Sequence, residues 1–171
     1  MATLRVEDEC DITPVIKVKN VPNPQNIYRE IKDILIMRCR LKDDHINEKR
    51  YIHEKGPKEE KIHAFLEAWR QMDKFTKVVI EITVEMALRP VHKEDIEYMG
   101  DVNMKIEGFV RTEYPQRTAV QKSILWDAFR TFYEKVLYGD IRENMMDLCR
   151  KYVKILDNEV RAYLALMPRT V

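Results

Sequence analysis

The chain has 171 residues, of which 45% are hydrophobic and 35% are charged, and its formal net charge is +1. This length and apolar content predict one domain, residues 1–171, with a single core. A net charge near zero removes the main electrostatic argument for a nucleic-acid partner, and small basic groups such as Lys17 and Lys19 are expected to be solvated. The high charged fraction is typical of a heavily solvated surface and fits a heat-adapted source.

Three cysteines, Cys10, Cys39 and Cys149, lie far apart and form no CxxC pair. We therefore expect no disulfide framework, no zinc site, no cofactor and a reducing, cytoplasmic location. The acidic N-terminus lacks the apolar segment of a secretory signal. No apolar run approaches the length of about 20 residues that a membrane span needs, so we expect no membrane span.

The N-terminal part of the chain predicts one strand and one helix. Residues 1–14 are polar and are expected to be frayed. Residues 15–21 (VIKVKNV) are a candidate for a short strand. Asn23 suits a helix N-cap and Pro24 suits the first helical position, so an amphipathic helix is predicted over 25–39.

Residues 49–54 predict a short strand that ends at the turn signal of Gly56. The following segment, 59–72, fits either structure, because its apolar residues match a helical stripe as well as strict alternation. Consecutive strands usually pair, and a hairpin around Gly56 would give a simple meander. We therefore predict a strand over 60–72, with a helix as the alternative.

The segment Thr76–Leu88 (TKVVIEITVEMAL) alternates between apolar and mostly polar residues and predicts a long central strand. Pro90 is expected to end this strand, and residues 91–100 to form a polar connection. Residues 101–114 alternate again and predict an antiparallel partner strand. Expected charge pairs on the outer face join Glu81 and Glu85 to Lys105 and Arg111.

Two helices are predicted after the last strand. Thr118 and Gln121 form a capping box before an aromatic-rich helix over 119–138. Gly139 suits the end of that helix, and a long C-terminal helix follows over 140–167. The fold class is therefore predicted to be α+β, an antiparallel β-meander of about four to five strands with an N-terminal helix and two long C-terminal helices packed on one face.

The space between the sheet and the 119–138 helix is the candidate ligand cavity, because concave apolar sites tend to lie between such layers. Gly108 interrupts a row of large apolar residues, which predicts either room for a ligand or close backbone approach, or a simple bulge. Ordinary core packing is the structural alternative for the whole set. The candidate ligand-binding residues are Met104, Ile106, Gly108, Trp126, Phe129, Phe132 and Tyr133.

Metal binding has one candidate site. A hairpin around Gly56 would bring His53 and His63 close together, with Glu67 on the same face, although exposed strand histidines are usually surface residues. Catalysis has no candidate residue: the chain lacks GxSxG, P-loop and GxGxxG motifs, and its one serine, Ser123, is predicted to be helical. The sequence therefore favours a protein that is not an enzyme.

Three segments, IYREIKDIL, LEAWRQMDKFTKVVIEI and NMKIEGFV, resemble a family of short uncharacterised archaeal proteins. The resemblance covers most of the chain and rests on strand and helix patterns, so it implies no functional residue. It favours the strand over 60–72. The combination of antiparallel sheet and long C-terminal helix also resembles the START-like helix-grip class of ligand-binding folds, at the level of fold alone.

These patterns specify no single function, and three hypotheses follow. The first is an intracellular, non-catalytic protein-interaction or self-association module, a homodimer through the C-terminal helices, because helices with a broad apolar arc tend to associate. The second is a carrier of an apolar small molecule in the cavity between sheet and helix. The third is a metal-dependent enzyme that uses His53 and His63.

Overall fold

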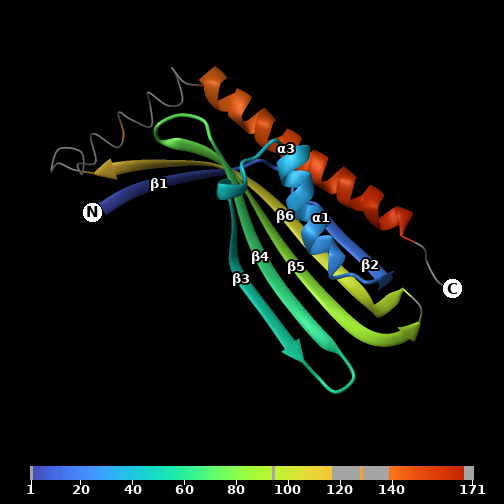
Figure 1. Cartoon of the computed structure of the whole chain (residues 1–171). Helices are drawn as coiled ribbons and strands as arrows, with labels where there is room; N and C mark the ends of the chain where they lie inside the picture. Colours follow the sequence, from blue (N-terminus) through green and yellow to red (C-terminus); the bar gives the residue numbers. More distant parts are fainter. Residues whose placement is uncertain (1, 94, 117–127, 129–138, 168–171) are drawn as a thin grey trace.

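The computed structural model describes residues 2–93, 95–116, 128 and 139–167 (Figure 1). Within these residues the chain forms six strands, a short 3-10 turn and the α-helices α1 and α3. The strands are β1 (Ala2–Glu9), β2 (Val15–Pro22), β3 (Ile46–Lys55), β4 (Glu60–Gln71), β5 (Thr76–Lys93) and β6 (Ile96–Gln116). The helices are α1 (Asn26–Met37) and α3 (Gly139–Leu166), and the 3-10 turn is η1 (Asp43–His45).

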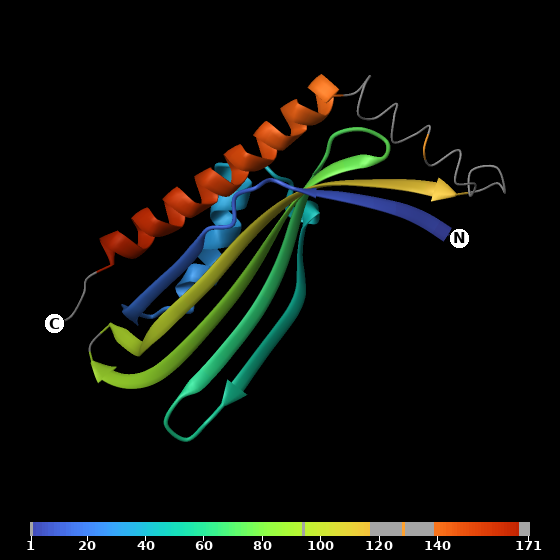
Figure 2. The same cartoon turned by 180° about the vertical axis from the view of Figure 1, so that it is seen from behind.

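The strands form one antiparallel sheet in the order β1-β6-β5-β4-β3, and β2 also pairs with β6. β1 pairs with residues 109–116 of β6, whereas β2 pairs with residues 99–105, so the two share one edge of that strand. Figures 1 and 2 show α1 and α3 on the same side of the sheet. We call the opposite side of the sheet the open face.

The core lies between the sheet and the two helices. The alternation predicted for β5 is present: its even-numbered apolar residues from Val78 to Leu88 are 0–3% exposed. Each such aliphatic side chain stabilises the fold by about 1.5–3 kcal/mol when buried. The helices bury matching residues at helical spacing, namely Ile27, Ile31, Ile34 and Leu35 of α1 and Cys149, Tyr152, Val153, Leu156 and Val160 of α3.

The predicted fold class is right in being α+β with an antiparallel sheet, but its element count is wrong. The sheet has six strands, because residues 2–9, within the segment expected to be frayed, pair with β6 as β1. The described residues contain one long C-terminal helix, α3, within a residue of the predicted bounds. The other predicted helix, 119–138, lies outside the described residues except for residue 128.

The central strand is longer than predicted, since β5 continues through Pro90 to Lys93. The reason is local. β4 begins at Glu60, opposite Leu88, so the residues of β5 after Leu88 pair with β6 alone. A proline is tolerated in such an edge segment, where no second neighbour needs its missing N–H. The hairpin therefore turns near Asp95, at a φ of 66°, and not over the whole of 91–100.

The strand predicted over 60–72 is confirmed as β4. It forms a hairpin with β3 in which the Gly56 N–H donates to the Glu59 carbonyl oxygen at 3.1 Å. A Cβ at Gly56 would lie only 2.6 Å from that oxygen, so the turn requires glycine. The turn predicted at Gly56 is therefore present, and its geometry explains why the residue is glycine.

The expectation of no disulfide is wrong, because Cys10 and Cys149 are bonded across 139 residues of sequence. The fold brings together the segment after β1 and the middle of α3, a proximity that cysteine spacing alone does not encode. Gly108 makes room for this bond: a Cβ there would lie 2.7 Å from Cys149 Sγ and 2.8 Å from Val153 Cγ2. The glycine marks the close approach of α3 to the sheet, and the ladder has no register shift at that position.

Candidate ligand groove on the open face

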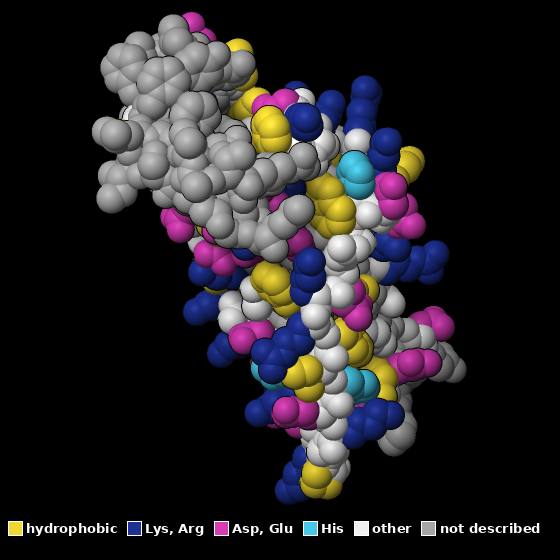
Figure 3. All heavy atoms as spheres, turned by 90° about the vertical axis from the view of Figure 1, so that its left-hand side faces the viewer, with side chains coloured by type: hydrophobic (Ala, Val, Ile, Leu, Met, Phe, Trp, Pro, Cys, Tyr) yellow, Lys and Arg dark blue, Asp and Glu magenta, His cyan; other side chains and the backbone are white. Residues whose placement is uncertain are grey.

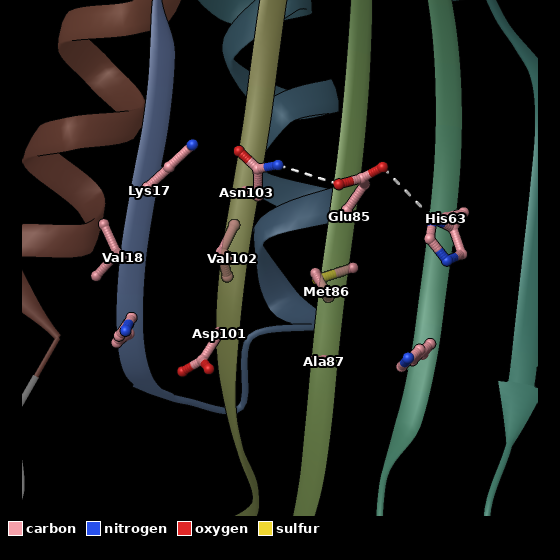
Figure 4. A pocket seen from close by; sticks show the side chains of 11 residues that line it. Lys17, Val18, His63, Glu85, Met86, Ala87, Asp101, Val102 and Asn103 are labelled. Atoms are coloured by element: carbon pink, nitrogen blue, oxygen red, sulfur yellow. Dashed lines mark hydrogen bonds and ion pairs between the residues drawn. The ribbon is translucent and has the colours of Figure 1, made fainter.

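A row of five side chains crosses the open face from one strand to the next. The ladder places Lys17 of β2 opposite Asn103 of β6, then Glu85 of β5, His63 of β4 and Ile52 of β3. Directly paired residues project to the same side, so these five form a single file. With neighbouring strands about 4.8 Å apart, the row is about 19 Å long. Figure 4 labels the first four residues of the row, from Lys17 to His63, and shows α1 behind the strands.

The middle of the row is linked by polar contacts (Figure 4). Asn103 Nδ2 donates to Glu85 Oε2 at 3.0 Å, and Glu85 Oε1 lies 3.8 Å from His63 Nδ1. The first contact orients the Asn103 amide, so its Oδ1 turns away from Glu85. That oxygen is buried and accepts no hydrogen bond from any described residue. Buried polar atoms usually have a hydrogen-bond partner, so this oxygen is an unsatisfied acceptor within the row.

One hollow of about 320 Å³ lies over the Lys17 end of the row. Its rim carries Lys17, Lys19 and Lys61, none of which forms an ion pair or side-chain hydrogen bond in the part of the chain that the structure describes. Apolar contact comes from Ala87, which lies on the open face opposite Lys61, whereas Val18 packs against the core. The hollow therefore combines uncompensated cations with apolar lining.

The carboxylates of the same hollow are already engaged. Asp101 accepts hydrogen bonds from the Arg89 guanidinium at 3.1 Å and from the Asn20 backbone N–H at 3.0 Å. Glu85 accepts from Asn103, as described above. Neither acid pairs with a rim lysine, so the local field at the rim is positive although the whole chain is nearly neutral.

A second hollow of about 500 Å³ lies over the other end of the row. It shares His63 and Glu85 with the first, so the two adjoin on the open face. We call the two hollows together the groove. The remaining lining residues of the second hollow are Arg50, Ile52 and Glu54 of β3, Ala64 and Phe65 of β4, and Thr83 of β5.

The predicted metal residues are not brought together. The turn around Gly56 sets Lys55 opposite Glu60 and therefore Ile52 opposite His63, so His53 projects to the other side of the sheet. There its Nε2 lies 2.7 Å from Glu60 Oε2. The sequence of β3, which is polar on both faces, does not indicate which of its residues lies opposite His63.

Glu67 is engaged elsewhere, with Lys49 and Arg111. Within the described residues no three His, Cys, Asp or Glu side chains are grouped so that they could hold a metal ion.

The predicted apolar cavity can be followed only from its sheet side. Met104 and Ile106 are 0% exposed, and Gly108 contacts the disulfide and α3 as described above. These sheet positions are filled by protein side chains. The aromatic half of the proposed cavity, Trp126, Phe129, Phe132 and Tyr133, lies outside the described residues.

A cluster of charges elsewhere on the open face has a structural role. The Arg111 side chain is 5% exposed and donates to Glu67 and Glu81, each at 2.9 Å, and to Glu7. It thereby joins β1, β4 and β5 to β6. Partial burial alone would raise the pKa of Glu7 and Glu67, but the nearby cations together outweigh it and hold both pKa values below the ordinary carboxyl range. These cations are Arg111 and Arg5 at Glu7, and Arg111 and Lys49 at Glu67.

The sequence indicated only part of this site. It predicted an Arg111–Glu81 type of charge pair, which the structure confirms, but it treated Lys17 and Lys19 as a solvated group. Because the register of β3 on β4 and the pairing of β2 with β6 are properties of the assembled sheet, the groove has no local sequence signature. Over the surface that Figure 3 displays, Lys and Arg side chains alternate with Asp and Glu side chains, so the excess at the rim is local.

No protein-family model matches this sequence, and no curated protein matches it. Similar solved structures include a delta-endotoxin, with a TM-score of 0.34 and 9% identity over 66% of this chain; the match spans 65% of that protein's length. A protein of unknown function from Staphylococcus aureus has a TM-score of 0.27 and 9% identity, covering 93% of this chain and 98% of that one. An uncharacterised protein from Rhizobium leguminosarum has a TM-score of 0.18 and 8% identity, covering 91% and 99%.

TM-scores this low support no conclusion about shared fold or function. The matches also do not bear on the archaeal family that the sequence resembles, which stays a prediction. The sequence specified no single function, and the lack of a matching family or curated protein agrees with that. No described helix is long and apolar enough to cross a membrane.

Proposed function

We propose that this protein binds a small organic anion, a carboxylate or phosphate monoester, in the groove on the open face. The observation that carries the proposal is the rim of the first hollow, where three lysines without an acidic partner among the described residues surround apolar lining. The carboxylates nearby are held by Arg89, Asn20 and Asn103. A ligand anion would supply the missing counter-charge.

The expected affinity is modest. An exposed ion pair contributes about 0–1 kcal/mol, so two or three lysines must act together with apolar contact. A dissociation constant in the micromolar to millimolar range, about −8 to −4 kcal/mol, fits these contributions.

The role is binding and not catalysis. His63 Nδ1 and Glu85 Oε1 are 3.8 Å apart, which is longer than a hydrogen bond, so the pair does not form an acid–base dyad. The groove residues also include no serine or cysteine. We therefore assign no reaction to this site.

The experiment is a calorimetric titration with butyrate and with methyl phosphate. The variant replaces Lys17 and Lys61 by Met, which keeps the length of the side chains and removes both charges. We expect about tenfold weaker binding than in the unaltered protein, and affinity that falls as salt is added. Lys151→Met is the control, because Lys151 is an exposed residue of α3. Equal affinities in the double variant and the control would contradict the proposal.

Self-association through the C-terminal helices is the weaker candidate. The outward side of α3 carries exposed Lys151, Lys154, Asn158 and Arg161, and Arg161 pairs with Asp157 within the helix. The exposed large apolar side chains of α3, Ile141 and Leu166, lie at its two ends. A polar, internally paired middle favours water over a partner helix. The groove is therefore the better-supported functional site.

The disulfide bears on the proposed location. Such bonds persist in oxidising compartments, and also inside cells of hyperthermophilic archaea and bacteria. The cytoplasmic location suggested by the cysteine spacing therefore implies a heat-adapted source, which the 35% charged fraction favours.

A further inference from the structure

We propose that the two hollows form one site, and that the bound anion carries a neutral apolar body, such as an aromatic ring, that lies on Phe65 and Ile52. This inference rests on the proposed function, since the anionic group is the part held by the rim lysines. It adds the class of ligand: an amphipathic anion with a spacer between its two ends.

The first argument is continuity. His63 and Glu85 line both hollows, so the two hollows adjoin at these residues. Both residues are members of the row that crosses the sheet. A ligand lying along that row would contact the rim of the first hollow and the apolar residues of the second at once.

The second argument is the contrast in charge between the two ends. In the first hollow three lysines, none with an ion-pair partner among the described residues, outnumber the two carboxylates. In the second, Arg50 and Glu54 flank Ile52 on the same face of β3, and neither has an ion-pair partner among the described residues. This hollow is lined by one cation, Arg50, and by two carboxylates, Glu54 and Glu85, so this end does not favour a second anionic group. A neutral body suits it better.

The third argument is exposed apolar surface. Phe65 and Ile52 are half-buried on an otherwise charged part of the open face, and Phe65 is the aromatic residue of the groove lining. Covering such surface is favourable at about 25 cal/mol per Å² of apolar area. These two side chains would gain most from a ligand body lying over them.

The spacing sets the length of the ligand. Lys61 and Phe65 lie on the same face of β4, four residues apart, which corresponds to about 13 Å along the strand. A lysine side chain is long enough to cover part of such a distance. A spacer of a few methylene groups between the anionic group and the ring would therefore span both ends.

The experiment compares butyrate, 4-phenylbutyrate and neutral 4-phenylbutanol by calorimetric titration. In the unaltered protein we expect 4-phenylbutyrate to bind about tenfold more tightly than butyrate, because the phenyl group is removed from water. Phe65→Ala should abolish that advantage and leave butyrate binding unchanged. Phe109→Ala is the matched control, since Phe109 is half-buried on the same face but lines neither hollow.

The outcomes separate the inference from the proposed function. Equal affinities of butyrate and 4-phenylbutyrate, or an advantage that survives in Phe65→Ala, would overturn the single extended site while leaving anion binding intact. Equal affinities of 4-phenylbutanol and 4-phenylbutyrate would overturn the requirement for an anion, and with it the proposed function. Phe65→Leu, which keeps an apolar side chain, provides a second variant if the alanine variant unfolds early on heating.

Discussion

At the scale of single residues, Arg111 shows why the open face is more than a solvated surface. Its guanidinium is nearly buried and holds carboxylates from three other strands. Breaking a buried charge cluster by removing one partner is far more costly than removing an exposed pair, because the remaining charges are left desolvated. Arg111 therefore ties the sheet together at the end opposite the groove lysines of β2.

The first prediction concerns this side chain. Arg111→Met should lower the free energy of unfolding by about 3 kcal/mol, since Glu67 and Glu81 would stay partly buried without their cation. Arg5→Met removes an exposed partner of Glu7 and should cost less than about 1 kcal/mol. Urea denaturation of both variants measures the difference. Equal losses would show that the cluster has no special role.

The second prediction follows from the lowered pKa of Glu7 and Glu67. A carboxyl whose pKa is lower when folded binds more protons in the unfolded state, so it adds stability above its unfolded pKa, about 4.3 for glutamate. That stability is lost as the pH falls through the folded pKa. The urea midpoint should therefore decline with pH below about 4 to 5, and less steeply in Glu67→Gln. An unchanged slope in that variant would contradict the assignment.

At the scale of elements, the sequence predicted the parts whose periodicity is strong. The alternation of β4, β5 and β6 predicts their structure and inner faces, and the apolar spacing predicts α1. The predicted N-cap is wrong: α1 begins at Asn26 after Gln25, and the Asn23 side chain instead accepts hydrogen bonds from β6. The sequence missed β1, because its residues are mostly charged and residues 5–9 have no buried face even within the sheet; β1 is defined by its pairing with β6. It also missed the register of β3, which the turn around Gly56 sets and in which a difference of one residue reverses the face of every side chain. That register separates the predicted histidine pair and places Ile52 in the groove.

The third prediction tests the contact between α3 and the sheet. Gly108→Ala should destabilise the fold by about 1–3 kcal/mol, because its Cβ would lie within 3.0 Å of Cys149, Val153 and Cys10. Gly139→Ala is the control, as a Cβ there meets nothing within 4 Å. Thermal unfolding of the two variants provides the comparison. A neutral Gly108→Ala would mean that α3 can move away from β6 at little cost.

At the scale of the whole molecule, the Cys10–Cys149 bond closes most of the chain into one loop. It fixes α3 to the segment between β1 and β2, and β2 carries the rim lysines of the groove. α3 also packs on β5 and β6. The disulfide therefore connects the helical layer to the edge of the sheet where the anion is proposed to bind.

The fourth prediction is that this bond dominates stability toward heat. In the chain-entropy model a loop of more than 100 residues stabilises a fold by about 5 kcal/mol, so reduction should lower the melting temperature clearly. Calorimetry with and without a phosphine reductant measures this loss, and the Cys10→Ala, Cys149→Ala double variant should show no further effect of the reductant. The number of free thiols checks the bond directly. Cys39 is free and buried, and burial raises the pKa of its thiol to about 11. Because the thiolate is the form that attacks a disulfide, Cys39 should not exchange with the Cys10–Cys149 bond. A thiol assay in denaturant should find one free thiol before reduction and three after it. Three free thiols before reduction would show that the bond does not form in the isolated protein.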